Sequence, residues 1–298
     1  MRPKEYRIKE LLRKKGLEGA IVSSPENFHY VTGFGGHQHT VSRQPGFTLA
    51  VMRADDKVPT HLTTMDFEAA TFRIKAAGLN FVVDPYDTWV GLKTWDEIAH
   101  GAVVPDKTAM ESSMDKLVQF MKACDLANKK VGIELDYLPV PYYKSLTEKF
   151  PEAEFVDISD LFVYARSVKQ PDEIEMFRKL CRIADHGFTE VSKIAKIGVS
   201  ERELVQCFRE DVIKSGFCAP SSWSMFSTGP PSERLTLPGD GVVKDGDVVK
   251  FDAGVNAEFD FYTTDTSRAW IIGNGDPALL KLKDRLYEGQ RRMIAEAK

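Results

Sequence analysis

Two aspartates near the end of the chain are spaced so that their carboxylates could lie side by side and bind a metal ion. Asp252 and Asp265 lie in apolar, strand-like runs within 248–272, on either side of a polar centre. This pattern predicts an antiparallel hairpin. With the turn centred on Glu258 and Phe259, Asp252 faces Asp265 directly. Because side chains alternate along a strand, both carboxylates then point to one face.

Two acids in this arrangement need a partner. Like charges directly opposed on neighbouring strands, about 5 Å apart, destabilise a sheet, and burial increases the penalty. Either a cation lies between them or one acid keeps its proton. Oxygen ligands at this spacing suit Mn²⁺, Zn²⁺ or Co²⁺. Two alternatives stay open: solvated acids near a hairpin tip, or Arg268 paired with one of them. The apolar neighbours, including Val249 and Phe251, favour a buried hairpin.

The elements that must position these acids fall into two parts. With 298 residues, 43% of them hydrophobic, the chain can bury a sizeable core, and about two domains are expected. Strand-like and helical patterns alternate over 1–160, which predicts an α/β domain. Two helical patterns then precede the hairpin, the second beginning with Ser200 and Glu203 in capping-box spacing. The predicted domains are therefore 1–160 and 161–298.

Composition excludes several classes of partner. The net charge is −4 and no block is strongly basic, which argues against nucleic acid and anionic membrane surfaces as partners. No run approaches the roughly 18 apolar residues of a membrane span, and the charged N-terminus is unlike a signal peptide. The four cysteines lack metal-ligand spacing. These features together predict a reduced, cytoplasmic protein.

Several segments resemble one family in the same order along the chain. Asp-Ala-Gly at 252–254 and Tyr-x-x-Asp-x-Ser-Arg at 262–268 resemble the first metal-ligand segment of the methionine aminopeptidase, prolidase and creatinase family. Residues 161–183 resemble the linker and first helix of prolidase-like catalytic domains, and residues 20–33 resemble their creatinase-type N-terminal domain. The resemblance implies an α/β creatinase-like N-terminal domain followed by the first half of a pita-bread catalytic domain.

The resemblance also implies a chemistry. Asp252 matches a terminal metal ligand, and Asp265 matches a ligand that bridges two divalent ions (Mn, Co or Zn). Twelve residues separate them here, against ten in the family, and the longer hairpin is expected to keep the acids opposed. The implied function is that of an Xaa-Pro peptidase, a hydrolase that cleaves an amide-type C–N bond with a metal-activated hydroxide. The implied substrate is a small peptide or small molecule, and the implied assembly is a homodimer.

Two departures bear on this reading. The family's remaining ligands, a His and two Glu, normally lie well downstream, but only 33 residues follow Asp265 (298 − 265), and Glu288 and Glu296 lie on a predicted helix. We therefore expect a C-terminally truncated chain that is inactive alone. The family's peptidases also carry a His where this chain has Leu235, and no His follows His186. The alternatives are a non-peptidase member acting on a creatine- or ectoine-like compound or a sulfonium, and a catalytically dead binding module.

Other residues are candidates for substrate contact. In the resembling dimers the N-terminal loop leans toward the partner's active site, so its polar side chains are expected to contact substrate rather than metal. Strand-like alternation would place the two His of this loop on one face, as in a metal pair, whereas an exposed loop is the simpler alternative. Aromatic and apolar residues before the hairpin could line the pocket or pack in the core. The candidates are His37, His39, Arg43, Trp223, Phe226 and Leu235.

Overall fold

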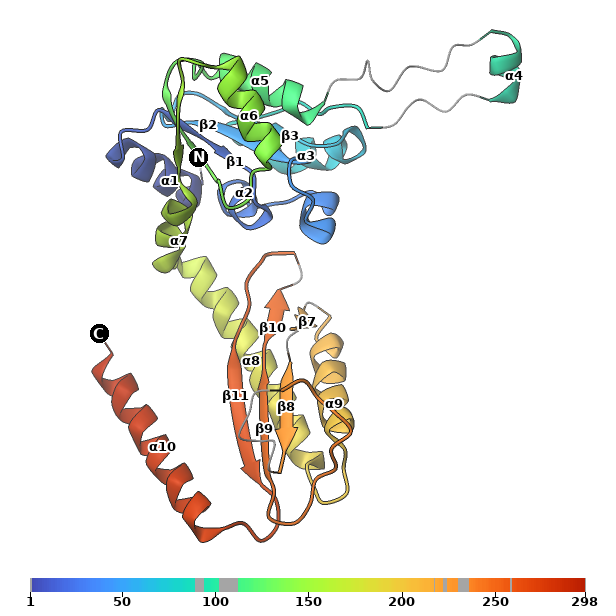
Figure 1. Ribbon diagram of the computed structural model, residues 1–298, viewed down its shortest axis with the longest axis vertical. Helices are drawn as coiled ribbons and strands as arrows, with labels where there is room; N and C mark the ends of the chain where they lie inside the picture. Colours follow the sequence, from blue (N-terminus) through green and yellow to red (C-terminus); the bar gives the residue numbers. More distant parts are fainter. Residues whose placement is uncertain are drawn as a thin grey trace. The chain divides into compact units, whose positions relative to one another are not determined.

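The chain forms two compact units, each with its own core. The computed structural model describes residues 2–88, 94–101, 112–216, 218–221, 224–229, 236–257 and 259–297. The units are Met1–Lys169 and Gln170–Lys298 (Figure 1). The division falls later than the predicted boundary at 160/161. The reason is that α7 (Ser159–Ser167) buries Leu161, Phe162 and Ala165 in the core of the first unit.

The first unit is a three-layer α/β domain, as the alternating patterns predict. Its sheet has the strand order β4-β3-β2-β1-β5-β6. Pairs β1–β2 and β2–β3 are antiparallel, and pairs β1–β5, β5–β6 and β3–β4 are parallel. The strands are β1 (Gly19–Val22), β2 (Leu49–Arg53), β3 (Thr60–Thr63), β4 (Phe81–Val83), β5 (Lys130–Ile133) and β6 (Glu154–Asp157). The helices besides α7 are α1 (Pro3–Lys14), α2 (Pro25–Thr32), the π-helix η1 (Gln38–Ser42), the 3-10 helix η2 (Asp66–Glu68), α3 (Ala69–Ala76), α4 (Trp95–Ala99), α5 (Ser113–Ala123) and α6 (Val140–Lys149).

Strand alternation divides the core between the two faces of this sheet. Ala20 and Val22 of β1 pack with residues from α1, α2, α3 and α7, whereas Ile21 packs with residues from α5 and α6. β2 alternates in the same way. All four residues of β1 are buried, which is typical of a central strand covered by helices on both faces.

The loop between β1 and α2 is held by one buried carboxylate. Glu134 is 2% exposed and accepts hydrogen bonds from the backbone N–H groups of Ser23 and Ser24, from Ser24 Oγ at 2.7 Å and from Asn27 Nδ2. Asn27 Oδ1 in turn accepts a bond from Arg166. Burial raises the pKa of Glu134, and the donated hydrogen bonds oppose this shift. The carboxylate therefore links β5 to the start of α2.

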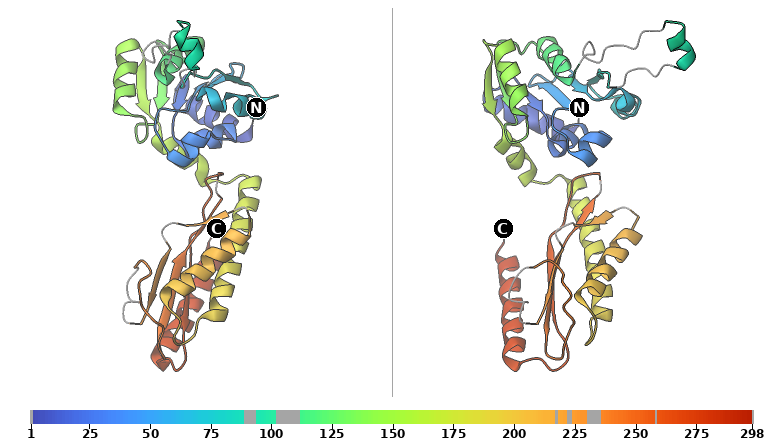
Figure 2. Two further views of the ribbon diagram at one scale, coloured as in Figure 1. Left: turned by 90° about the vertical axis from the view of Figure 1, so that its right-hand side faces the viewer. Right: turned by 45° about the vertical axis from the view of Figure 1, so that its right-hand side comes forward.

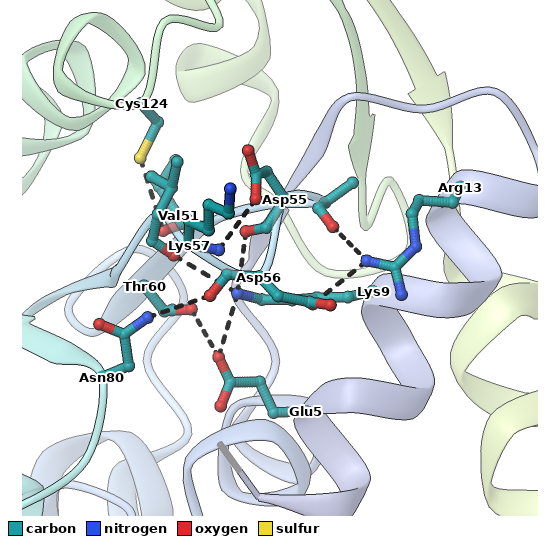
Figure 3. Close-up of polar contacts among 12 residues, drawn as sticks. Glu5, Lys9, Arg13, Val51, Asp55, Asp56, Lys57, Thr60, Asn80 and Cys124 are labelled. Atoms are coloured by element: carbon teal, nitrogen blue, oxygen red, sulfur yellow. Dashed lines mark hydrogen bonds and ion pairs between the residues drawn. The ribbon is translucent and has the colours of Figure 1, made fainter.

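A second buried charge anchors α1 (Figure 3). Lys9 is fully buried and lies 3.4 Å from Glu5, which is also buried. Lys9 donates to the carbonyl oxygens of Asp55 and Val58, and Thr60 Oγ1 donates to Glu5 at 3.1 Å. A charged group this deep is stable only when paired and hydrogen-bonded. The pair therefore joins α1 to the turn that precedes β3.

The second unit packs two helices against one face of a small sheet. Antiparallel strands β8 (Met225–Thr228), β9 (Val248–Ala253) and β11 (Thr266–Ile271) form a sheet in the order β11-β9-β8. A second, two-stranded sheet pairs β7 (Cys218–Pro220) with β10 (Val255–Ala257). The helices are α8 (Pro171–Ile194), α9 (Glu201–Lys214) and α10 (Pro277–Glu296). Figure 2 shows α8 and α9 together on one side of the β8–β9–β11 sheet, with α10 on the other side.

Sequence signals set the ends of these helices. Ser200 and Glu203 form the expected capping box at the start of α9, and α8 begins with Pro171 in its first turn. No residue of α10 is buried, so this helix gains no core packing from the residues that the structure describes. None of the described helices combines the length and apolar composition needed to cross a membrane.

The core of the second unit centres on Phe251. Its ring lies 5.1–5.3 Å from the rings of Phe188, Phe208 and Phe226. Gly187 lets α8 and α9 approach closely, because a Cβ atom there would lie 2.8 Å from the Phe208 ring. Phe251 is one residue before Asp252, so the aromatic cluster fixes which face of β9 turns away from the helices.

Candidate metal centre

The two aspartates are brought together, but not in the predicted register. Asp252 pairs with Ser267, and Ala253 pairs with Thr266. Asp265 therefore stands opposite Gly254, two residues from the expected partner. The turn lies at Phe259–Asp260, one residue later than predicted, and Phe261 has a positive φ of 59°. The Ala257 N–H donates to the Tyr262 carbonyl oxygen at 2.8 Å, so the last hydrogen-bonded pair of the hairpin differs from the one assumed from the sequence.

The shift leaves both acids on one face. In a strand, a shift of one residue reverses the face and a shift of two restores it. Asp252 and Asp265 are therefore diagonal rather than directly opposed neighbours, a spacing that side chains can still bridge. The face itself differs from the expectation of a buried hairpin: Val249, Phe251 and Ala253 are buried, whereas Asp252 is half-buried and Asp265 is exposed. The acids lie on the face that α8 and α9 do not cover.

The electrostatics of the pair match its geometry. The pKa of Asp252 is raised, first by partial burial and then by the charge and hydrogen bond of the Asp265 carboxyl group. Lys250, two residues away on the same face of β9, acts in the opposite direction. The two carboxyl groups therefore interact, and one cationic side chain offsets only part of their repulsion.

The alternative ion pair with Arg268 does not form. Arg268 pairs with Phe251 across β9 and β11, so its side chain points to the helical face. There its guanidinium group lies 2.6 Å from Asp185 of α8 and over the ring of Phe188. Arg268 therefore leaves the charges of Asp252 and Asp265 unneutralised.

Asp252 and Asp265 could supply part of a metal coordination sphere. Carboxylate oxygens are suitable ligands for hard and borderline divalent ions. Within the described ranges, no group of three or more His, Cys, Asp or Glu side chains could hold a metal ion. The donor set therefore fits a divalent ion in chemical type, and two carboxylates are what these residues contribute to it.

The N-terminal candidates are separated from one another. His37 is exposed and His39 is fully buried, because the segment forms the π-helix η1 rather than an alternating strand. His39 Nε2 lies 2.8 Å from the carbonyl oxygen of Ser23, and burial lowers the pKa of His39 to about 4. His39 is thus part of the interior of the first unit, which corrects its expected role in substrate contact. Arg43 is bound to Glu26 at 2.6 Å.

Of the three candidate pocket residues before the hairpin, the structure describes one. Phe226 is 1% exposed and packs on Phe251, so it belongs to the core rather than to a substrate pocket. Trp223 and Leu235 lie outside the described residues. His186, which precedes this region on α8, pairs with Asp211 of α9 at 2.8 Å on the surface.

The residues that hold the hairpin beside these acids have structural roles that no sequence pattern predicted. Tyr262 donates a hydrogen bond to Glu173 of α8 at 2.8 Å, and Glu173 also caps the backbone N–H of Gln170. Ser221 and Thr264 bond to the backbone between the two acids. Only the proximity of Tyr262 and Thr264 to Asp265 could have indicated this role, since the partners of Tyr262 and Ser221 are remote in sequence.

Comparison with known proteins agrees with both units. Residues 6–168 match the creatinase/prolidase N-terminal domain, and residues 175–298 match metallopeptidase family M24. An uncharacterized peptidase, YqhT of Bacillus subtilis, is 23% identical over 98% of this chain and 71% of its own length. An Xaa-Pro dipeptidase of Pyrococcus horikoshii is 27% identical over 61% of this chain, and the match spans about half (51%) of that relative.

Solved structures show the same fold. The Xaa-Pro dipeptidase from Bacillus anthracis superposes with a TM-score of 0.74 at 20% identity, over 97% of this chain and 70% of that chain. The prolidase from P. horikoshii superposes with a TM-score of 0.72 at 18% identity, over 100% and 73% respectively. Both matches extend across the N-terminal unit and the unit that carries the two aspartates. The chain therefore belongs to the prolidase-like members of metallopeptidase family M24, a family of hydrolases, with a creatinase-type N-terminal domain.

Proposed function

We propose that this chain is part of a metal-dependent hydrolase that cleaves an amide-type C–N bond, with Asp252 and Asp265 among its metal ligands. The observation that carries the proposal is that both carboxyl groups lie on one face of the hairpin. This is the face that α8 and α9 do not cover. Partial burial and then the interaction with Asp265 raise the pKa of Asp252, and a cation bound there would neutralise the charge of the pair.

The surrounding residues support a cation as the missing partner. Arg268 is committed to Asp185 on the opposite face, and Lys250 offsets the acids only in part. Divalent ions at this position would polarise a substrate carbonyl and make a water molecule more acidic. Asp252 and Asp265 would hold those ions, and the aromatic packing of Phe251 would keep the Asp252 side chain on the open face.

The substrate class we favour is a small peptide with proline after the scissile bond, because two similar proteins carry the name Xaa-Pro dipeptidase. A second candidate is a small non-peptide amide or related compound. Leu235 favours it, since the resembling peptidases have a His at that position and a Leu can neither donate a hydrogen bond nor carry charge. Losing one preorganised donor to a developing oxyanion costs about 10²–10³-fold in rate.

Metal binding tests the proposal first. Mn²⁺ and Co²⁺ affinities should be measured by titration calorimetry for the wild-type chain and for Asp252→Asn and Asp265→Asn. Each variant should lose more than about 100-fold in affinity, because losing a ligand costs at least as much as losing a supporting hydrogen bond. Asp260→Asn, in the turn of the same hairpin, is the matched control and should bind like wild type. Equal binding by all four proteins would refute the assignment of these ligands.

Activity distinguishes the substrates. The whole hydrolase, loaded with metal, should be assayed on Xaa-Pro dipeptides and on small amides and guanidino compounds, alongside its Leu235→His variant. Turnover of Xaa-Pro dipeptides that rises about 10²-fold or more in Leu235→His would favour a peptidase ancestry with a changed substrate. Efficient wild-type turnover of Xaa-Pro dipeptides would exclude the second candidate.

A further inference from the structure

The strand that carries Asp252 changes sheets at Gly254. Upstream, β9 pairs with β8 and β11. Downstream, β10 pairs with β7. Gly254 separates the two strands, and Asp265 stands opposite this residue. The step between the sheets therefore lies between the two acids, and whatever fixes its geometry also fixes their separation.

On one side of the step, the side chain of Thr264 replaces a backbone acceptor. In a regular antiparallel ladder, Val255 and Thr264 would exchange two N–H···O=C bonds. The Thr264 N–H donates to the Val255 carbonyl oxygen at 3.0 Å, as expected. The Val255 N–H, however, donates to Thr264 Oγ1 at 3.0 Å. Thr264 is 5% exposed, so this bond is made in the interior.

Ser221 makes the same replacement on the other side. The Ser221 N–H donates to the Gly254 carbonyl oxygen at 2.9 Å. The Gly254 N–H donates to Ser221 Oγ at 2.9 Å rather than to the Ser221 carbonyl oxygen, which instead accepts a bond from Ser224 Oγ at 3.0 Å. Ser221 is 1% exposed. Consecutive N–H groups, those of Gly254 and Val255, therefore both bond to side-chain hydroxyls.

The ladder is interrupted at the position of Asp265. Regular pairing of β9 with β11 ends at Ala253 and Thr266, and the next bridge joins Asn256 and Thr263. The two omitted pairs are Gly254 with Asp265 and Val255 with Thr264. The Val255 N–H bonds to Thr264 Oγ1 instead of the Thr264 carbonyl oxygen, which accepts a bond from Thr263 Oγ1 at 3.2 Å. Asp265 is the next residue, so the bond through Oγ1 bears directly on the placement of Asp265.

We propose that Ser221 and Thr264 are positioning residues for the Asp252–Asp265 pair. Their hydroxyl groups fix the geometry of the sheet-switching step, and with it the separation of the two carboxylates that would hold a divalent ion. The inference rests on the proposed metal site and adds residues outside the carboxylates to it. A purely structural role, satisfying two buried N–H groups, would affect stability but would leave the geometry of metal binding unchanged.

The test compares variants that keep or remove the hydroxyl. Thr264→Val has nearly the same shape without an acceptor, and Thr264→Ser keeps the acceptor. Ser221→Ala removes the other hydroxyl. Thr266→Val is the matched control, because Thr266 also adjoins Asp265 but pairs with Ala253, on the face of the sheet opposite to the two acids. Affinity for Mn²⁺ is measured by titration calorimetry, and the visible spectrum of the Co²⁺ complex reports coordination geometry independently of activity.

We expect Thr264→Val and Ser221→Ala to bind Mn²⁺ about 10–100-fold more weakly, the usual effect of losing an outer-shell partner, with an altered Co²⁺ spectrum. Thr264→Ser and Thr266→Val should match wild type. If Thr264→Val does not fold, Ser221→Ala decides. Wild-type affinity and spectrum in the hydroxyl variants, while Asp252→Asn loses the metal, would overturn this inference alone. Failure of wild type to bind metal would overturn the proposed function and this inference with it.

Discussion

Replacing Glu134 with glutamine should destabilise the first unit, although the side chain keeps its size. The carboxylate receives two backbone N–H groups on one oxygen and the donors of Ser24 and Asn27 on the other. A glutamine can keep its carbonyl oxygen on the backbone pair. Its NH₂ group then meets Asn27 Nδ2, which is also a donor. Asn27 cannot invert without losing the bond that its Oδ1 accepts from Arg166.

The magnitude follows from this count. At least one buried donor is left without an acceptor, which costs about 1–3 kcal/mol. The substitution also removes a buried charge whose pKa is raised by desolvation, so the net loss should not exceed this range. Glu134→Ala removes the acceptor for all four donors and should cost more than about 3 kcal/mol, a large share of the 5–15 kcal/mol typical of a domain.

Urea unfolding followed by circular dichroism measures the loss, and hydrogen–deuterium exchange of residues 19–33 assigns it to the first unit. Glu154→Gln is the matched control. Glu154 lies in the next strand, is 63% exposed and pairs with Lys130 at 2.8 Å, so its loss should cost less than about 1 kcal/mol. A Glu134→Gln protein within about 0.5 kcal/mol of wild type would refute the reasoning.

Two further effects are expected. Burial lowers the pKa of His39 to about 4 from 6.5, so the unfolded chain takes up a proton that the folded chain resists. The neutral His39 side chain therefore contributes up to about 3 kcal/mol to the free energy of unfolding above pH 6.5. This contribution is lost as the pH falls from 6.5 toward 4. Urea unfolding should show a lower free energy of unfolding at pH 5 than at pH 7 in wild type, and a smaller difference in His39→Phe. Equal differences in the two proteins would contradict the prediction. Gly187→Ala should cost about 1–3 kcal/mol, because the new Cβ would lie 2.8 Å from Phe208. Gly289→Ala, where a new Cβ would meet nothing within 4 Å, should be neutral or slightly stabilising in the same urea unfolding assay, and equal losses in both variants would exclude the packing argument.

Local patterns were sufficient where neighbouring residues decide the structure. The strands Gly19–Val22 and Phe81–Val83, the capping box at Ser200 and the division into an α/β unit followed by a helix-and-hairpin unit all follow from short-range chemistry. The domain boundary did not follow, because the assignment of α7 depends on which core its apolar face meets. The burial of Lys9 could not be read from a charged residue on an amphipathic helix, since its partners lie about 50 residues away.

The hairpin shows most clearly which features the local sequence predicts and which depend on tertiary contacts. The sequence by itself determined that Asp252 and Asp265 lie on paired strands, because apolar alternation and the polar centre are local properties. It also determined their common face, since a two-residue error in register preserves that face. Only the tertiary structure decided the register, the exposure of that face and the fate of Arg268. Each of these depends on groups distant in the chain: Ser221 and Thr264 at the step, the α8 and α9 helices behind the sheet, and Asp185 beside the guanidinium group.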